Sequence, residues 1–246
     1  MERALALNGV LGGNEVEVVH ANNLEVLGRM SQERGNSAAA ANYLMRALAI
    51  NEEIESQVGQ AANLNNLGLI TGKSDPQRAE EYLRRSLAIT EGGLNGECVR
   101  VEYWPVASAA VDSAPNSART IDVPVEYLAE YKLDPDKGLR RLLALRKLSA
   151  DAHGNLAVLA REGGDLAAAE REFLRLLEVH KDLEDKSGMA ADLDNLAMIS
   201  QTHRHLSAAC TAWTRSMTIY GEIGWAKAAE VISAKMRAAG CRNGGL

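Results

Sequence analysis

Residues that could carry out catalysis or hold a metal are few in this 246-residue sequence. The most suggestive group is His203, His205 and Cys210, because imidazole nitrogens and thiolates are ligands of zinc. No fourth ligand is spaced to complete a tetrahedral site, and we expect the two histidines to lie in a solvated turn. Cys98 follows Glu97, but no nearby residue supplies a base for its thiol. Phosphate-binding, nucleophile-elbow and metalloprotease motifs are also missing, so we predict no catalytic residue, metal or cofactor.

Another chemical type recurs instead, an asparagine directly before a Leu-Gly or Leu-Ala pair. The asparagines are Asn66, Asn155 and Asn195, and an earlier copy of the pattern has Val26 in that place. On a helix, the neighbour of a core leucine lies about 100° away around the axis, off the packed stripe. An amide offers both hydrogen-bond donors and an acceptor. These side chains are therefore candidates for binding through hydrogen bonds.

The asparagines belong to an internal repeat. Leu24–Gly28 reappears 40 positions later as Leu-Asn-Asn-Leu-Gly, and Gly154–Ala157 reappears 40 positions later as Asp-Asn-Leu-Ala. A second anchor follows each first one, and Arg46–Ile50 returns after 39 positions as Arg-Ser-Leu-Ala-Ile. Four units share one register, which chance does not explain.

The spacing within each unit predicts two helices joined by a short turn. In the third unit a helical pattern ends before Gly163, and Asp165 is typical of the N-cap of a second helix over 167–177. Breaks at 35–36 and 74–76 have the same role in the first two units. Small residues at matching places would let the two helices of a hairpin approach closely: Gly28 with Ala40, Gly68 with Ala79, Ala157 with Ala169, and Ala197 with Ala209. Such hairpins bury their apolar faces by stacking on one another.

The pattern Leu-x-x-Leu-Gly/Ala, a turn, Ala-x-x-x-aromatic or Leu, and then Ala-Leu-x-Ile resembles the tetratricopeptide repeat. The resemblance covers residues 20–92 and 140–225. The 40-residue period and the segments NLNNLGLI and RALAINEE are most similar to the extended, kinesin-light-chain-like class. The resemblance implies an all-α fold, a right-handed α-solenoid of helical hairpins with an irregular central insertion or degenerate repeat.

The resemblance also implies a binding surface. In this family the asparagine corresponding to Asn66, Asn155 and Asn195 lines a concave groove and bonds to the backbone of a bound peptide. Further side chains expected on the same surface are Asn65, Arg29, Lys73, Arg161 and Asp194. No lysine stands four residues before the three asparagines, so recognition of heat-shock chaperone tails is not expected. The alternative is that the asparagines serve only local helix packing.

Residues 93–137 interrupt the repeat and contain four of the five prolines. Alternating apolar residues over 99–103 and 121–125 predict two short strands. The segment is either a degenerate repeat or surface excursion, or an arm or lid that contacts a partner. We therefore divide the chain into N-terminal repeat units at 1–92, the irregular segment, and C-terminal units with a capping helix at 138–246.

Both ends of the chain have sequence patterns typical of helices. Arg3–Asn8 repeats Arg46–Asn51 almost letter for letter, which predicts that the chain begins partway through the second helix of a repeat. The chain is then either derived from a longer array or starts with a half-hairpin that acts as a cap. Trp225–Ala239 predicts the C-terminal capping helix, which stops at Gly240.

Composition limits the partners and the compartment. The net charge of −6 argues against nucleic acid held by phosphate neutralisation. No apolar run approaches the length needed to cross a bilayer, so no membrane association is expected. The three cysteines are odd in number and widely spaced. No disulfide framework is therefore expected, and a reducing, cytoplasmic location is predicted.

These observations predict a non-catalytic scaffold that binds a protein or peptide ligand in the concave groove. Exposed repeat ends are expected to allow self-association. An alternative is the regulatory or sensor portion of a larger signalling protein, such as a bacterial nucleotide-binding switch or a protease. A third hypothesis places an enzyme active site within residues 93–137.

Overall fold

The structure is a computed structural model. The residues that it describes are 13–92, 98–103, 119–124 and 135–241. Within these residues the chain forms nine helices and one two-stranded sheet. The helices confirm the predicted all-α repeat architecture, and the small sheet lies where the repeat pattern breaks. By internal contacts the chain divides into two units, residues 1–98 with 124–159 and residues 99–123 with 160–246.

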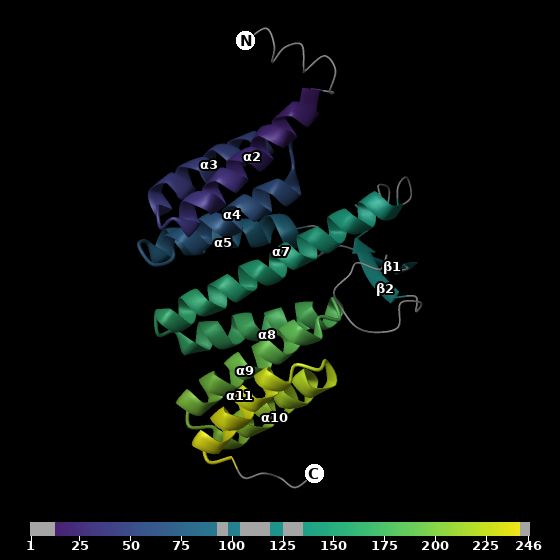
Figure 1. Cartoon of the computed structure of the whole chain (residues 1–246). Coiled ribbons are helices and arrows are strands. Elements are labelled where there is room, and N and C mark those ends of the chain that lie inside the picture. The colour runs from purple at the N-terminus through teal and green to yellow at the C-terminus, as the bar shows by residue number, and fades with distance from the viewer. Residues whose placement is uncertain (1–12, 93–97, 104–118, 125–134, 242–246) are drawn as a thin grey trace. The chain divides into compact units, whose positions relative to one another are not determined.

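The first unit contains two helical hairpins and most of a longer helix (Figure 1). Helices α2 (Gly13–Glu33) and α3 (Ser37–Glu53) form one hairpin, and α4 (Gln57–Thr71) and α5 (Pro76–Glu91) form the other. Most of α7 (Pro135–Glu162) completes the unit. One buried cluster joins α3, α4 and α5 through Leu44, Leu48, Leu64, Leu67 and Tyr82. A second cluster joins α5 to α7 through Leu83, Leu87, Ala152 and Leu156.

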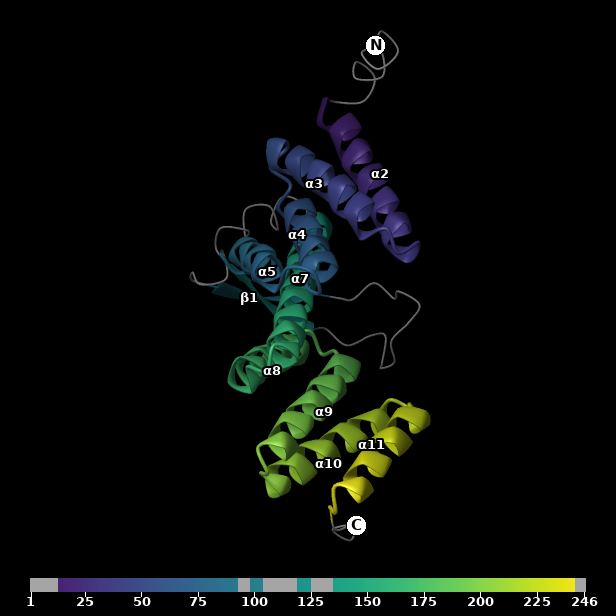
Figure 2. The same cartoon turned by 90° about the vertical axis from the view of Figure 1, so that its left-hand side faces the viewer.

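The second unit contains α8 (Leu166–Asp182), α9 (Lys186–Thr202), α10 (Leu206–Glu222) and α11 (Ala226–Ala238) (Figure 2). Its core is the buried set Ala197, Ala209, Trp213, Ile232, Met236 and Cys241. Helix α11 is the predicted capping helix. It ends before Gly240, whose φ of 79° lies in the left-handed region that glycine adopts without strain.

The central sheet consists of β1 (Cys98–Tyr103) and β2 (Arg119–Pro124). Both strands fall where the alternation of apolar residues predicts them. The other residues between 93 and 134 lie outside the described part of the chain, and so do residues 1–12 with the predicted half-repeat. The division at 92 and 137 stays a prediction.

The turns inside the hairpins confirm the predicted caps. The Asn36, Asp75 and Asp165 side chains accept hydrogen bonds from backbone amides three residues later, at 3.0, 3.1 and 2.8 Å. Each bond satisfies an amide that the first helical turn would otherwise leave unpaired. The turn before α10 differs, because its N-cap residue His205 makes no such bond.

Small residues do let the helices approach closely. A Cβ added to Gly68 would lie 2.6 Å from Leu83 Cγ and 3.3 Å from the Ala79 carbonyl oxygen. A Cβ added to Gly28 would lie 3.0 Å from Leu44 Cγ. In the second unit, Ala197 and Ala209 belong to one buried cluster. Helices α8 and α10 begin at 166 and 206, which reproduces the 40-residue period.

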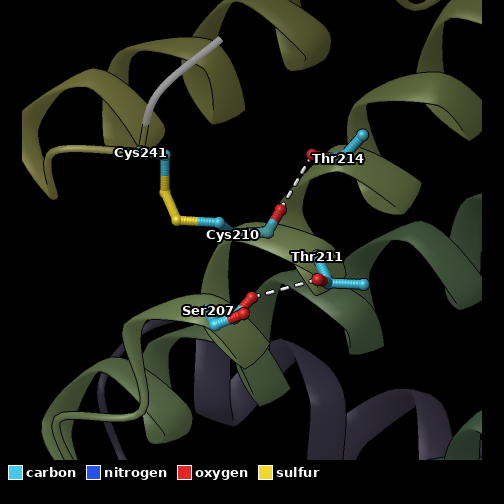
Figure 3. The surroundings of a disulfide bond; sticks show 5 residues. All are labelled: Ser207, Cys210, Thr211, Thr214 and Cys241. Atoms are coloured by element: carbon cyan, nitrogen blue, oxygen red, sulfur yellow. Dashed lines mark hydrogen bonds between the residues drawn. A yellow bond between two sulfur atoms is a disulfide. The ribbon is translucent and has the colours of Figure 1, made fainter. Parts of the chain in front are cut away.

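The cysteines contradict the expectation that the chain holds no disulfide. Cys210 on α10 and Cys241, after the end of α11, form a disulfide across 31 positions of sequence (Figure 3). The count and spacing of the cysteines did not predict it, because the pair meets only when α11 packs against α10. Disulfides persist in oxidising compartments, so the cysteine argument for a reducing compartment no longer holds.

Candidate functional site

The first unit carries a pocket of about 340 Å³ along one side of α2. Seven residues from three helices line it: Asn22, Glu25, Val26, Arg29, Gln32, Leu44 and Asn66. Four polar residues lie on α2 at spacings of three and four, so one face of the helix presents them all. Leu44 comes from α3, and Asn66 comes from α4 of the next hairpin. The pocket therefore joins two successive repeats.

A chain of buried polar groups fixes one wall of the pocket. The Asn51 amide donates to Asn63 Oδ1 at 3.0 Å, and the Asn63 amide donates to Glu25 Oε1 at 2.6 Å. Asn51 and Asn63 are buried, and Glu25 is half-buried. Burial raises the pKa of the Glu25 carboxyl, and the hydrogen bonds from Asn63 and Asn51 oppose this rise. Glu25 is therefore held in a defined position by the two asparagines.

Arg29 supplies the positive charge of the pocket. Its side chain is exposed, and it has no ion pair or hydrogen bond with any residue of the described part of the chain. Glu25 stands four positions earlier on α2, yet the two form no salt bridge because Glu25 is bonded to Asn63 instead. The guanidinium therefore keeps its five donors for a group that enters the pocket.

Three residues singled out from the sequence, Val26, Arg29 and Asn66, come together in this pocket. Asn66 is exposed although its neighbour Leu67 is fully buried, as the helical geometry predicts. Lys73 is also exposed, and Asn155 is half-buried, but neither lines the pocket.

Asn65 lies elsewhere. Its side chain is only 5% exposed, and its amide donates to the Leu148 carbonyl of α7 at 2.9 Å. The bond ties α4 to α7 within the first unit. We therefore leave Asn65 out of the proposed contact residues.

The remaining sequence candidates lie in the second unit and contact one another or the core. Arg161 donates to Asn195 Oδ1 at 2.9 Å, and the Asn195 amide donates to the Ala191 carbonyl at 3.1 Å. Asp194 accepts from the Trp213 indole at 2.9 Å and from Lys235 at 2.5 Å. Asp194 thus links three helices, α9, α10 and α11. Its two partners leave it less available to a ligand than Arg161 or Asn195.

Sequence inspection missed Glu25, Asn22 and Gln32, which line the pocket beside Arg29. Their spacing along α2 was visible in the sequence, since 22, 25, 29 and 32 share one helical face. The bond between Glu25 and Asn63 was not visible, because it joins residues 38 positions apart.

The described part of the chain holds no group of three or more His, Cys, Asp or Glu residues arranged to bind a metal ion. His203 and His205 are exposed in the turn between α9 and α10, as predicted, and Cys210 is in the disulfide. Among the described residues, no helix combines the length and the apolar character that crossing a membrane requires.

The repeated helical hairpins define a helical-repeat protein. The pocket lies between two successive hairpins of it. Residues 19–92 match the tetratricopeptide-repeat family. This match spans the hairpin of α2 and α3 and the hairpin of α4 and α5, and it is confined to those residues. No curated protein matches the chain at the level of sequence.

Solved structures share the fold at low identity. The crystal structure of BtubC (BKLC) from P. vanneervenii is 15% identical, with a TM-score of 0.56 over 100% of this chain and 89% of that chain. The apo form of RapI is 12% identical, with a TM-score of 0.55 over 96% of this chain and 53% of RapI. A putative kinesin light chain from Podosopora anserina with nearly identical TPR-like repeats is 14% identical. That match spans 82% of this chain and 95% of the kinesin light chain, but its TM-score of 0.34 is too low to indicate a shared overall arrangement.

Proposed function

We propose that this protein is a non-catalytic scaffold that binds a protein or peptide ligand, and that the α2 pocket is one of its contact sites. Tetratricopeptide repeats generally mediate interactions between proteins. The observation that carries the proposal is that Asn66 and Arg29, from successive hairpins, line one pocket.

The pocket suits an extended segment of polypeptide. The exposed Asn66 amide can donate to and accept from a ligand backbone, and the Arg29 guanidinium, which has no partner among the described residues, can bind a carbonyl or carboxylate. Val26 and Leu44 provide apolar contact beside these groups. Because Glu25 is already fixed by Asn63, binding need not order this wall, which lowers the entropic cost.

In the second unit, Arg161 and Asn195 are proposed as further contacts. They bond to each other at 2.9 Å in the unliganded chain. A ligand that engages Asn195 would replace this bond or add to it. We expect a smaller contribution from this pair than from Arg29, which has no bond to give up among the described residues.

The test is selection of ligands from a random peptide library by the whole chain, followed by affinity measurements on the enriched peptides. Replacing both Arg29 and Asn66 by alanine should weaken binding by about tenfold or more, as expected for the loss of one charge-assisted and one neutral hydrogen bond. The matched control replaces Arg46 and Asn42, which are the same residue types exposed on α3 outside the pocket.

Peptides that bind the wild type and the control equally, but bind the pocket variant weakly, would support the proposal. Equal binding by all three proteins would place the ligand elsewhere. If no peptide is enriched, the proposal of a peptide-binding groove is contradicted.

A second candidate function is the sensor or regulatory portion of a larger signalling protein. What supports a larger protein is that RapI, which shares the fold, is about twice as long as the part that this chain matches. The mass of the native gene product distinguishes the two functions, because only the second requires a further domain.

A further inference from the structure

Two junctions between successive hairpins have the same backbone design. Helix α3 leads into α4, and α8 leads into α9, through a single residue with positive φ, Glu55 at 55° and Glu184 at 54°. In each case the next residue is the N-cap, Ser56 or Asp185, whose side chain accepts from the amide of a glycine three positions later. The two junctions are therefore equivalent places in the repeat.

Each junction buries one polar pair that connects its two helices. At the first junction, Asn51 near the end of α3 donates to Asn63 on α4 at 3.0 Å. At the second, Nδ1 of His180 near the end of α8 lies 2.6 Å from Oδ2 of Asp192 on α9. Both pairs are 12 positions apart in sequence.

A glycine makes room for each pair. A Cβ added to Gly59 would lie 2.3 Å from Asn51 Oδ1, and a Cβ added to Gly188 would lie 2.6 Å from the His180 ring. At such distances an added Cβ would require the Asn51 amide or the His180 ring to shift. A glycine at the same place in the repeat thus leaves space for an asparagine in the first unit and for a histidine in the second.

A third junction, from α10 to α11, shows that the pair need not be polar. Tyr220 and Ile232 occupy the same positions, again 12 apart, and the Tyr220 ring stacks on Trp225 at 6.0 Å between centroids. A polar pair is therefore a property of the first two junctions and not a requirement of the fold.

The two polar pairs differ in one chemical respect, because amides do not titrate whereas imidazole and carboxyl groups do. The side chain of Asp192 is 3% exposed and that of His180 is 16% exposed. Burial raises the pKa of Asp192, and the hydrogen bond and charge of His180 oppose this rise. An ionised Asp192 is thus stabilised by a protonated His180 and costly to bury beside a neutral one.

Other titratable groups lie near the pair. Asp185 in the turn and Tyr220 on α10 interact with it electrostatically, and Asp194 on α9, which is bonded to Lys235 on α11, interacts with Tyr220. Asp185 is half-buried, which acts to raise its pKa, but hydrogen bonds from Ser187 and Gly188 and the charge of His180 outweigh burial and lower it. Burial and the charges of Asp194 and Asp192 raise the pKa of Tyr220. Lys235 is bonded to Asp194, and His180 is the basic side chain that lies directly against Asp192.

We propose that the α8–α9 junction is a protonation-sensitive contact, in which the proton on His180 sets how firmly α9 is held on α8, whereas the α3–α4 junction is its pH-insensitive counterpart. The stabilisation is present while His180 is protonated and is lost as pH rises through its titration. The raised pKa of Asp192 acts in the same direction, since a group with a raised pKa loses stabilisation as pH rises. The lowered pKa of Asp185 acts oppositely, and its stabilisation is lost only as pH falls into the acidic range.

The junction lies next to a proposed ligand contact. Asn195 follows Asp192 by three positions on α9, so both lie on neighbouring turns of the same face. A loosening of α9 would therefore displace Asn195 from Arg161, which holds it at 2.9 Å. This effect on ligand contacts rests on the proposed function, but the protonation-sensitive contact does not.

The test compares amide hydrogen exchange in the wild type with that in His180→Asn/Asp192→Asn, which installs the first unit's pair in the second. The ratio of the two exchange rates is taken at each pH, so that the intrinsic pH dependence of exchange cancels. Between pH 5.5 and 8, protection of α9 in the wild type should fall relative to the variant. We expect a fall of about tenfold, which corresponds to the weakening of one hydrogen bond between charged groups.

Helix α4 serves as the internal control, because its junction pair is Asn51 and Asn63 in both proteins. A constant ratio at α4 with a falling ratio at α9 supports the proposal. A ratio at α9 that does not change with pH overturns it. These outcomes do not depend on whether any peptide binds, so they are separate from the test of the proposed function.

A reciprocal variant keeps the proposal testable if the first one does not fold. Asn51→His/Asn63→Asp places the titratable pair in the first unit beneath Gly59. Protection of α4 should then fall with rising pH, as α9 does in the wild type. An unchanged pH dependence at α4 contradicts the proposal, and so does a nuclear magnetic resonance titration in which His180 gains no proton down to pH 5.

Discussion

At the scale of single residues, neighbouring positions have opposite roles because a helix turns about 100° per residue. Asn65 and Asn66 are identical in type and adjacent in sequence. Asn65 is buried and bonded to the Leu148 carbonyl, whereas Asn66 lines the pocket. The amide group alone therefore does not define a contact residue, and its angular place on α4 decides its role.

The junction glycines give a prediction at the same scale. Gly59→Ala should lower the free energy of unfolding by about 1–3 kcal/mol, because the new methyl group would overlap Asn51. Gly221→Ala on α10 is the matched control, since nothing lies within 4 Å of its Cβ position. The control should be neutral or raise stability by about 0.5–1 kcal/mol.

Urea unfolding followed by circular dichroism measures both variants. Equal stabilities for Gly59→Ala and Gly221→Ala would show that Asn51 moves aside at little cost. The close contact would then be unimportant for the junction.

At the scale of elements, the capping helix α11 is held both by burial and by a covalent bond. Ile232 and Met236 pack with Trp213 of α10 in the buried cluster that also contains Cys241. The disulfide to Cys210 closes the chain around the turn between the two helices. In Figure 3 the Thr211 and Thr214 hydroxyls donate to carbonyls one turn earlier on α10, those of Ser207 and Cys210.

Removal of this disulfide should destabilise α11 more than the rest of the chain. Cys210→Ser/Cys241→Ser is expected to lower the free energy of unfolding by about 3 kcal/mol, because a loop of this length loses substantial entropy when it is closed. Amide exchange should show the loss of protection concentrated in α11. Reduction of the wild type with dithiothreitol should reproduce the change.

Cys98→Ser is the control for the loss of a cysteine that is not in the pair. If the double variant unfolds at the same urea concentration as the control, the packing of Ile232 and Met236 alone holds α11. In that case the disulfide adds no stability.

At the scale of the whole molecule, the burial of a side chain depends on whether another helix packs against the face that carries it. Leu27 and Leu67 are the same residue in the same repeat position, yet Leu27 is 42% exposed and Leu67 is fully buried. Leu67 packs with Leu44 and Leu48 of the preceding helix α3. No described helix precedes α2, so Leu27 lacks that cover, as do Val19 and Met30. Self-association through such a face stays a prediction, which the mass of the chain in solution checks.

The same comparison predicts unequal effects for one substitution. Leu67→Ala should cost about 2–5 kcal/mol, the range for removing a buried leucine. Leu27→Ala should cost about 1 kcal/mol or less, because its side chain is already partly solvated. Thermal unfolding of the two variants under identical conditions provides the measurement. Similar losses at both positions would mean that Leu27 is covered in solution.

The fold was largely predictable from the sequence, whereas the candidate site was predictable only in part. The hairpin turns, their caps, the capping helix and the two strands follow from local patterns, and the structure confirms each one. Of the eight predicted contact residues, Arg29 and Asn66 line the pocket, and Asn65 is buried. The local pattern does not encode which face of each helix its neighbours cover.

The sequence by itself determined the repeat, its period and the positions of the close helix contacts, because helix periodicity, capping and small-residue placement act over a few turns of one chain segment. Only the tertiary structure decided three other features, which are the pocket wall made by Glu25 and Asn63, the disulfide between Cys210 and Cys241, and the pairing of His180 with Asp192. Each of these depends on two side chains from different helices meeting in a buried place. Burial and partnership are set by the packing of neighbouring helices within each unit, and the same residue types elsewhere in the chain remain exposed.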